Sequence, residues 1–138
     1  MMRRQNGLAL LESLIATLLL AIGLLGAIGM QARAYSALSD ASMRAEATMA
    51  SERLLAQMSI DQANLASYAY TGSGVPNARV SGWVAQTRAA IPGAGLVVQV
   101  TPVAATSRSV INIAVTWQRK QGGATNQHLM TSYIANSQ

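Results

Sequence analysis

The distribution of apolar and polar residues divides the chain into three parts. Residues 13–32 are 20 consecutive positions without a charged side chain, most of them Leu, Ile, Ala or Gly. In residues 33–60, apolar residues three or four positions apart give one helical face. The members of this face are Met43, Ala47, Ala50, Leu54 and Met58. Runs of β-branched residues begin only after residue 95, so the pattern predicts one long helix followed by a small mixed region.

The long helix is predicted to be continuous. The first 75 residues contain no proline, and residues 30–71 contain no glycine. We therefore expect one helix from about Leu8 to about Ile60, made of an apolar part, 8–32, and an amphipathic part, 33–61. The uncharged stretch alone spans about 30 Å, which is the thickness of a bilayer hydrocarbon core.

The C-terminal part is predicted to form a small head. Residues 62–95 are expected to be a loop that contains a short helix, 82–91, with Ser81 as its N-cap. Residues 96–138 are expected to form an antiparallel sheet of three or four strands. The strand candidates are 96–101, 110–118 and 129–134. The predicted fold class is α+β, a long N-terminal helix packed on a small antiparallel sheet.

Two of these segments have side chains that share one side. In the short helix, Trp83, Thr87 and Ala90 fall on one side. In the second strand, four large side chains alternate with polar or smaller ones and share one face. They are Ile111, Ile113, Val115 and Trp117. We expect the sheet to bury one face against the amphipathic part of the long helix.

The composition excludes several kinds of chemistry. The chain has no cysteine, which rules out a disulfide, a zinc–thiolate site and a cysteine nucleophile. His128 is the single histidine and stands in a predicted polar junction between loop and strand, where we expect no metal. No carboxylate side chain follows Asp61, so the head lacks a general acid or base. We therefore expect neither an enzyme nor a cofactor.

The charges are unevenly distributed. The net charge is +5, and all five acidic residues lie in the first 61 positions. Asp40 and Arg44 stand four residues apart and are expected to pair on the helix surface. A basic head is able to attract nucleic acid or another acidic partner, but its bases are scattered. Arg119 and Lys120 are the only adjacent pair in the head, and we interpret them as solvating residues rather than a nucleic-acid site.

Three interpretations of the N-terminus compete. Arg3 and Arg4 precede the apolar stretch, which is typical of a signal anchor with a cytoplasmic N-terminus. The second interpretation is a secretory signal peptide removed after Ala34, because residues 32–34 have a small–x–small pattern. The apolar stretch is longer than the ~7–15 residues usual for such peptides, and Arg33 lies inside that site.

The third interpretation rests on a resemblance. Residues 3–7, Arg-Arg-Gln-Asn-Gly, followed by Leu-Ala-Leu-Leu-Glu, resemble the class III signal of type IV pilins and related pseudopilins. The resemblance implies that prepilin peptidase cuts between Gly7 and Leu8 and that the new amine of Leu8 is methylated. Glu12 then becomes the fifth residue, as in that family. Members usually have Phe as the first residue after the cut, and this chain has Leu8.

Three glycines interrupt the membrane stretch at equal spacing. Gly23, Gly26 and Gly29 each lower helix stability by roughly 1 kcal/mol relative to Ala and permit close helix approach. They are interpreted either as ordinary membrane-helix packing or as a weak point that unwinds when subunits pack into a filament. Residues 21–26, Ala-Ile-Gly-Leu-Leu-Gly, closely resemble the membrane segment of the minor pilins called PilV.

The resemblance also implies a function and partners. It implies a minor pilin, residues 8–138, which is inserted in the inner membrane with its head in the periplasm and then enters an extracellular pilus at or near the tip. Its partners are then prepilin peptidase, membrane lipid, other minor pilins and the major pilin. A minor pseudopilin of a type II secretion system is the alternative within the same fold. A secreted adhesin or binding module cut after Ala34 is the alternative from another class.

Overall fold

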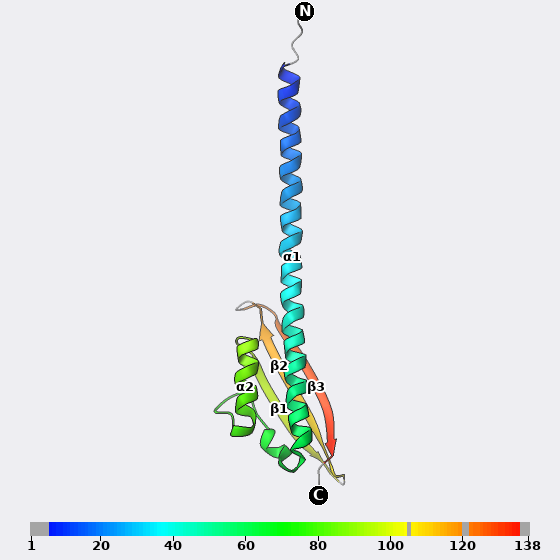
Figure 1. Ribbon diagram of the computed structural model, residues 1–138, viewed down its shortest axis with the longest axis vertical. Coiled ribbons are helices and arrows are strands. Elements are labelled where there is room, and N and C mark those ends of the chain that lie inside the picture. The colour runs from blue at the N-terminus through cyan, green and yellow to red at the C-terminus, as the bar shows by residue number, and fades with distance from the viewer. Residues whose placement is uncertain (1–5, 105, 120–121, 136–138) are drawn as a thin grey trace, which may run out of the picture. The chain divides into compact units, whose positions relative to one another are not determined.

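The computed structural model describes residues 6–104, 106–119 and 122–135. The elements along the chain are α1 (Asn6–Ile60), the 3-10 helix η1 (Gln62–Tyr68), α2 (Ala78–Ala90), β1 (Gly95–Val103), β2 (Arg108–Gln118) and β3 (Thr125–Ala135) (Figure 1). The chain forms two compact units, Met1–Ser39 and Asp40–Gln138, and α1 contributes to both. The predicted α+β class, a long N-terminal helix with a small antiparallel sheet, is confirmed, and the sheet has three strands.

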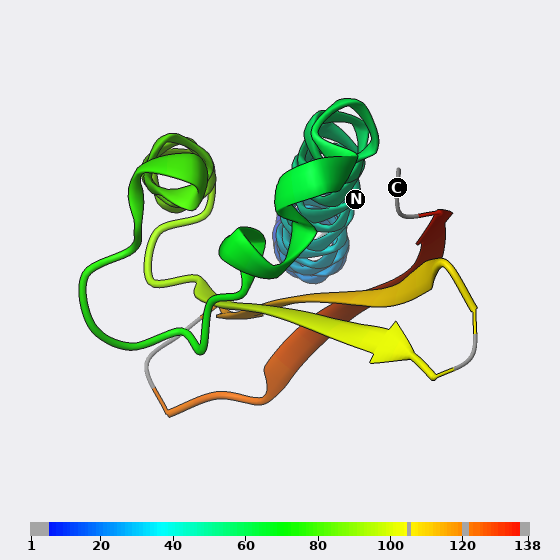
Figure 2. The same ribbon diagram turned by 90° about the horizontal axis from the view of Figure 1, so that it is seen from below.

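The second unit is built on the sheet, whose strand order is β1-β2-β3. Both pairings are antiparallel, and β2 pairs with β3 over eleven consecutive positions, from Arg108 opposite Ala135 to Gln118 opposite Thr125. Within this unit, α2 and the last turns of α1 lie over the same face of the sheet (Figure 2). No helix of the described residues lies on the other face of the sheet (Figure 2).

The core of this unit forms where the two predicted apolar faces meet. Ala47, Ala50, Leu54 and Met58 of α1 are buried, and Met43 packs partly buried against the same core. All four predicted side chains of β2 are buried as well: Ile111, Ile113, Val115 and Trp117. Both periodicities therefore predicted the core side of their element correctly.

The helix α2 begins four residues before the predicted start of 82–91. Asn77, and not Ser81, is its N-cap, because the Asn77 side chain accepts hydrogen bonds from the backbone N–H groups of Arg79 and Val80. Its buried residues are Val80, Trp83, Val84 and Thr87. Ala90, predicted on the same side as Trp83 and Thr87, is exposed in the last turn of α2.

The predicted loop after α1 contains the helix η1. A cluster of polar side chains around Asp61 stabilises it. The Asp61 carboxylate accepts hydrogen bonds from Asn64 Nδ2 at 2.6 Å and from the Tyr68 hydroxyl at 3.0 Å. It also forms an ion pair with Arg79 of α2, whose guanidinium lies over the Tyr68 ring. The cluster therefore ties together the end of α1, η1 and the start of α2.

The structure corrects two further predictions. Asp40 pairs with Arg119 (2.7 Å between Oδ2 and Nη1) rather than with Arg44, because β2 ends beside this part of α1. All three strands are longer than predicted, and β1 continues past Pro102. A proline is tolerated there because β1 is an edge strand.

Candidate functional site: the exposed N-terminal part of α1

The first unit consists, in its described part, of the N-terminal turns of α1, and their apolar side chains are exposed. The exposed fraction is 74% for Leu8 and 69% for Met30, and each Leu and Ile between them is at least half exposed. This part of α1 is long and apolar enough to cross a membrane. An apolar surface of this extent requires lipid or another protein as its cover.

The hydroxyl groups of this segment satisfy their hydrogen bonds inside the helix. Ser13 Oγ donates to the backbone oxygen of Leu10 at 3.0 Å, and Thr17 Oγ1 donates to that of Ser13. Such bonds leave no hydroxyl donor unsatisfied in an apolar environment. The polar side chains next to Glu12 in sequence are therefore compatible with lipid.

Glu12 differs from these residues. It is the only charged residue in 8–32, it is exposed, and no ion pair of the described residues includes it. Its neighbours on the same side of the helix are Leu8, Leu11, Ile15, Ala16 and Leu19. The site is therefore one carboxylate within an apolar stripe, and no described residue places a basic group in that stripe.

The predicted cleavage site lies at the start of the same helix. Gly7 and Leu8 belong to the first turn of α1, which begins at Asn6. Most of the predicted leader, residues 1–5, lies outside the described residues. The described helix thus places Leu8 one turn from Glu12, on the same side.

The three glycines leave an open strip on the helix surface. The helix is unbroken through Gly23, Gly26 and Gly29, and a Cβ added at any of them has no neighbour within 4 Å. No side chain of the described chain therefore fills the space that these glycines leave. A second helix is able to approach the backbone closely there.

In the second unit, one small cavity of about 180 Å³ is lined by Asp40, Arg119, Gly123, Ala124 and Asn126. The ion pair between Asp40 and Arg119 occupies its charged side. His128 is not in a junction, as predicted, but inside β3, opposite Val115. Within the described residues, no group of three His, Cys, Asp or Glu side chains is placed to hold a metal ion.

The sequence analysis did not identify the apolar residues that share one side of the helix with Glu12. Positions 8, 11, 15, 16 and 19 have the helical spacing that would have revealed it, but every position in the segment is apolar. Periodicity therefore gives no contrast there, and only the position of the acid selects a face. Comparisons with protein-family models, with curated proteins and with solved structures find no match for this chain.

Proposed function

We propose that the chain is a minor pilin, which primes assembly of a type IV pilus and enters it at or near the tip. The observation that carries the proposal is the register of Gly7, Leu8 and Glu12 at the start of an exposed apolar helix. A helix of this kind followed by a small α+β head agrees with the plan that the resemblance implies.

Glu12 has a specific role in this proposal. After cleavage the amine of Leu8 is a positive charge, and a neighbouring subunit presents it to Glu12 in the apolar interior of the filament. A carboxylate buried without a partner is costly, whereas a paired carboxylate is tolerated. Subunits in the wrong register leave the charge unpaired and are therefore rejected.

N-terminal mass analysis of the chain recovered from cells tests the processing step. The proposal requires a chain that starts at Leu8, with a methylated amine. A chain that starts at Tyr35 would instead show that a secretory signal peptide ends at Ala34 and would reject the proposal. In the structure, Ala34 lies in the middle of α1, which supports an intact helix over this site.

A Glu12→Ala variant tests the pairing step. Incorporation into filaments sheared from the cells should fall by tenfold or more, on the order of the effect of one unpaired buried charge. Ser13→Ala is the matched control, because it removes a neighbouring polar group that bonds only within the helix. Incorporation of Glu12→Ala at the wild-type level would contradict the pairing role.

A minor pseudopilin of a secretion system remains the second candidate, because it requires the same processing and the same helix. The two are separated by the filament in which the chain is found. Sheared surface pili that contain the chain favour the pilin, whereas secretion lost on deletion, with pili intact, favours the pseudopilin.

A further inference from the structure

The two edges of the sheet differ. On the β1 edge, Tyr70 and Val98 exchange two backbone hydrogen bonds, Tyr70 N to Val98 O at 2.9 Å and Val98 N to Tyr70 O at 2.8 Å. Gly72 lies against the backbone oxygen of Leu96 on the same side. At the opposite edge, no strand or bridge of the described residues pairs with the outer side of β3. The β1 edge is therefore bridged at Val98, whereas the β3 edge has no partner strand among the described residues.

The β3 edge also lacks the features that usually protect such strands. The residues of β3, Thr125–Ala135, include no proline and no charged side chain. Its pairing with β2 runs over eleven positions without a bulge. A long, regular and uncharged edge strand presents a row of backbone N–H and C=O groups to which another strand can bind.

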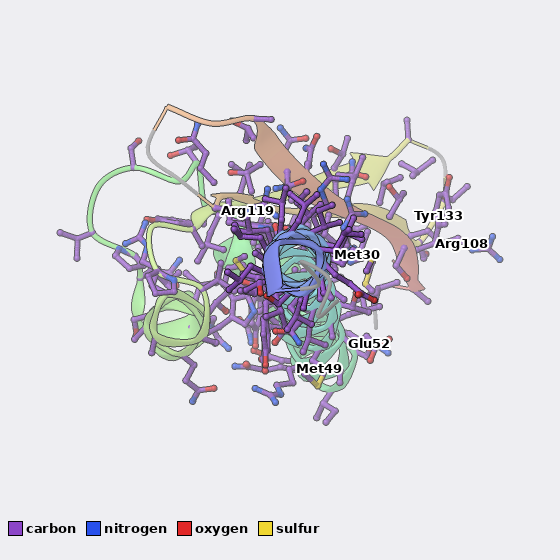
Figure 3. All side chains as sticks on the ribbon, turned by 90° about the horizontal axis from the view of Figure 1, so that it is seen from above. Met30, Met49, Glu52, Arg108, Arg119 and Tyr133 are labelled. Atoms are coloured by element: carbon purple, nitrogen blue, oxygen red, sulfur yellow. The ribbon has the colours of Figure 1, made fainter. Side chains whose placement is uncertain are left out.

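The side chains beside this edge favour an apolar partner with an acid at one end. Leu129 and Tyr133 of β3 are 60% and 66% exposed. They pair with Ala114 and Val110, which alternate with the buried residues of β2, so both lie on the face of the sheet away from the core. Arg108 of β2 is exposed and makes no ion pair within the described residues. Figure 3 shows Arg108 and Tyr133 next to each other, in agreement with the register of the two strands.

We propose that β3 binds an extended segment of another polypeptide, which adds a fourth strand to the sheet. Only an extended strand matches a row of alternating backbone donors and acceptors. The segment presents apolar side chains beside Leu129 and Tyr133 and an acidic residue near Arg108. This inference rests on the proposed function in one respect, since it takes the partner to be another subunit of the same assembly.

The strand directions argue against a second copy as the partner. If two β3 strands paired antiparallel, the Asp40–Ile60 helical segments of the two copies would run in opposite directions. The N-terminal ends of these segments would then lie at opposite ends of the dimer. Two subunits held in one membrane by their N-terminal segments do not meet in this way. If two β3 strands paired in parallel, one sheet would be flipped relative to the other. Leu129 of one copy would then lie on the same side as the helix-covered face of the other copy.

Photo-crosslinking in cells that assemble the filament tests this proposal. Benzoylphenylalanine replaces Tyr133, to which it is similar in shape, or Leu129, in the full chain. The control position is Thr101, which is exposed in the same row of the sheet as Tyr133 but on β1, the edge strand that Pro102 interrupts. We expect adducts from positions 129 and 133 to map to residues four apart on one segment of one other protein.

Three results would overturn the proposal. They are adducts no stronger than those from position 101, adducts to a second copy of this chain, and adducts whose spacing does not fit a strand. A second measurement compares the adduct yield of two double variants, each with benzoylphenylalanine in place of Gln127. Leu129→Lys with Tyr133→Lys should lower the adduct yield about tenfold, because charges block an edge strand, whereas Gln99→Lys with Thr101→Lys should leave it unchanged.

The same cells separate this inference from the proposed function. If the adduct forms while the chain is absent from sheared filaments, the β3 edge binds a strand and the pilin proposal fails. If the chain is present in filaments without an adduct at 129 or 133, the pilin proposal stands and the strand proposal fails.

Discussion

The indole nitrogen of Trp83 donates a buried hydrogen bond, 2.8 Å long, to the backbone oxygen of Ala50. The bond joins α2 to the part of α1 that forms the core of the second unit. The other tryptophan, Trp117, is buried as well, but its Nε1 has no hydrogen-bond partner among the described residues. The two tryptophans thus differ in one bond and are similar in burial.

Replacing each tryptophan by phenylalanine should therefore have different effects. Both substitutions lose part of the ring, but only Trp83→Phe also loses a hydrogen bond, which contributes about 1 kcal/mol. We expect the free energy of unfolding to fall by about that much more in Trp83→Phe than in Trp117→Phe. Denaturant unfolding of the full chain in micelles, followed by circular dichroism, measures the difference. Equal losses would show that the bond to Ala50 contributes nothing.

The carboxylate of Asp61 should make stability depend on acid pH. The hydrogen bond from Asn64 is the largest influence on its pKa and lowers it, and Tyr68 and Arg79 act in the same direction. Partial burial opposes them, but the pKa of Asp61 still falls below its ordinary value of 3.8. The folded chain therefore binds fewer protons there than the unfolded chain, so stability is full above pH 3.8 and declines as pH falls through the lowered pKa.

An Asp61→Asn variant should be less stable than wild type at neutral pH and should lose this part of the acid dependence. Unfolding midpoints measured from neutral pH down to about pH 2 give the comparison, since that range covers a lowered carboxyl pKa. Glu52→Gln is the control, because Glu52 is exposed and belongs to no ion pair of the described residues. If the midpoints of Asp61→Asn and wild type fall in parallel, the cluster does not act through this charge.

Two glycines in the loop before α2 should respond differently to alanine. Gly72 and Gly74 both have positive φ, 89° and 77°, so a side chain at either is strained by roughly 1 kcal/mol. At Gly72 the added Cβ also comes within 2.9 Å of the Leu96 backbone oxygen, whereas at Gly74 it meets nothing within 4 Å. We expect Gly72→Ala to lose at least 1 kcal/mol more than Gly74→Ala, in the range of overpacked sites. Similar losses would mean that the loop moves away from β1 at little cost.

Much of the fold follows from the sequence, because its strongest signals are local. Composition alone determines that α1 is a helix, and the alternation in β2 determines which of its sides is buried. The predicted start of α2 is wrong because Asn77 and Ser81 are both good N-cap residues. The helix begins after Asn77, where it places Val80 in the core. A local pattern does not contain that information.

The pairs between distant residues were the least predictable. Arg119 lies 79 positions from Asp40, and the helical spacing favoured the nearer Arg44. The open edge of β3 likewise depends on sheet order, which the strand patterns do not specify. At the N-terminus, the sequence shows the spacing of Gly7 and Glu12. Which apolar side chains lie on the same side of the helix as Glu12, and that they are exposed, is seen only in the structure.

The glycines of the apolar segment should weaken the helix locally. Gly23, Gly26 and Gly29 have no neighbour that an added methyl group would meet, so alanine fits at each. Each replacement should stabilise the helix by about 1 kcal/mol, which corresponds to about fivefold slower amide exchange where exchange follows local opening. Hydrogen exchange of the full chain in micelles, followed by mass spectrometry of peptides from residues 20–32, measures this.

Ala27→Gly is the matched control in the same segment, because it adds a glycine and should speed exchange. If the glycines serve as a weak point in assembly, the triple alanine variant should reach the membrane at the wild-type level but enter sheared filaments less well. If they serve close helix packing, incorporation should fall to the same extent for Gly26→Ala alone, since one methyl group is enough to separate two backbones. Unchanged exchange in both the alanine variants and Ala27→Gly would contradict a local weakness, because helix propensity would then have no effect on opening.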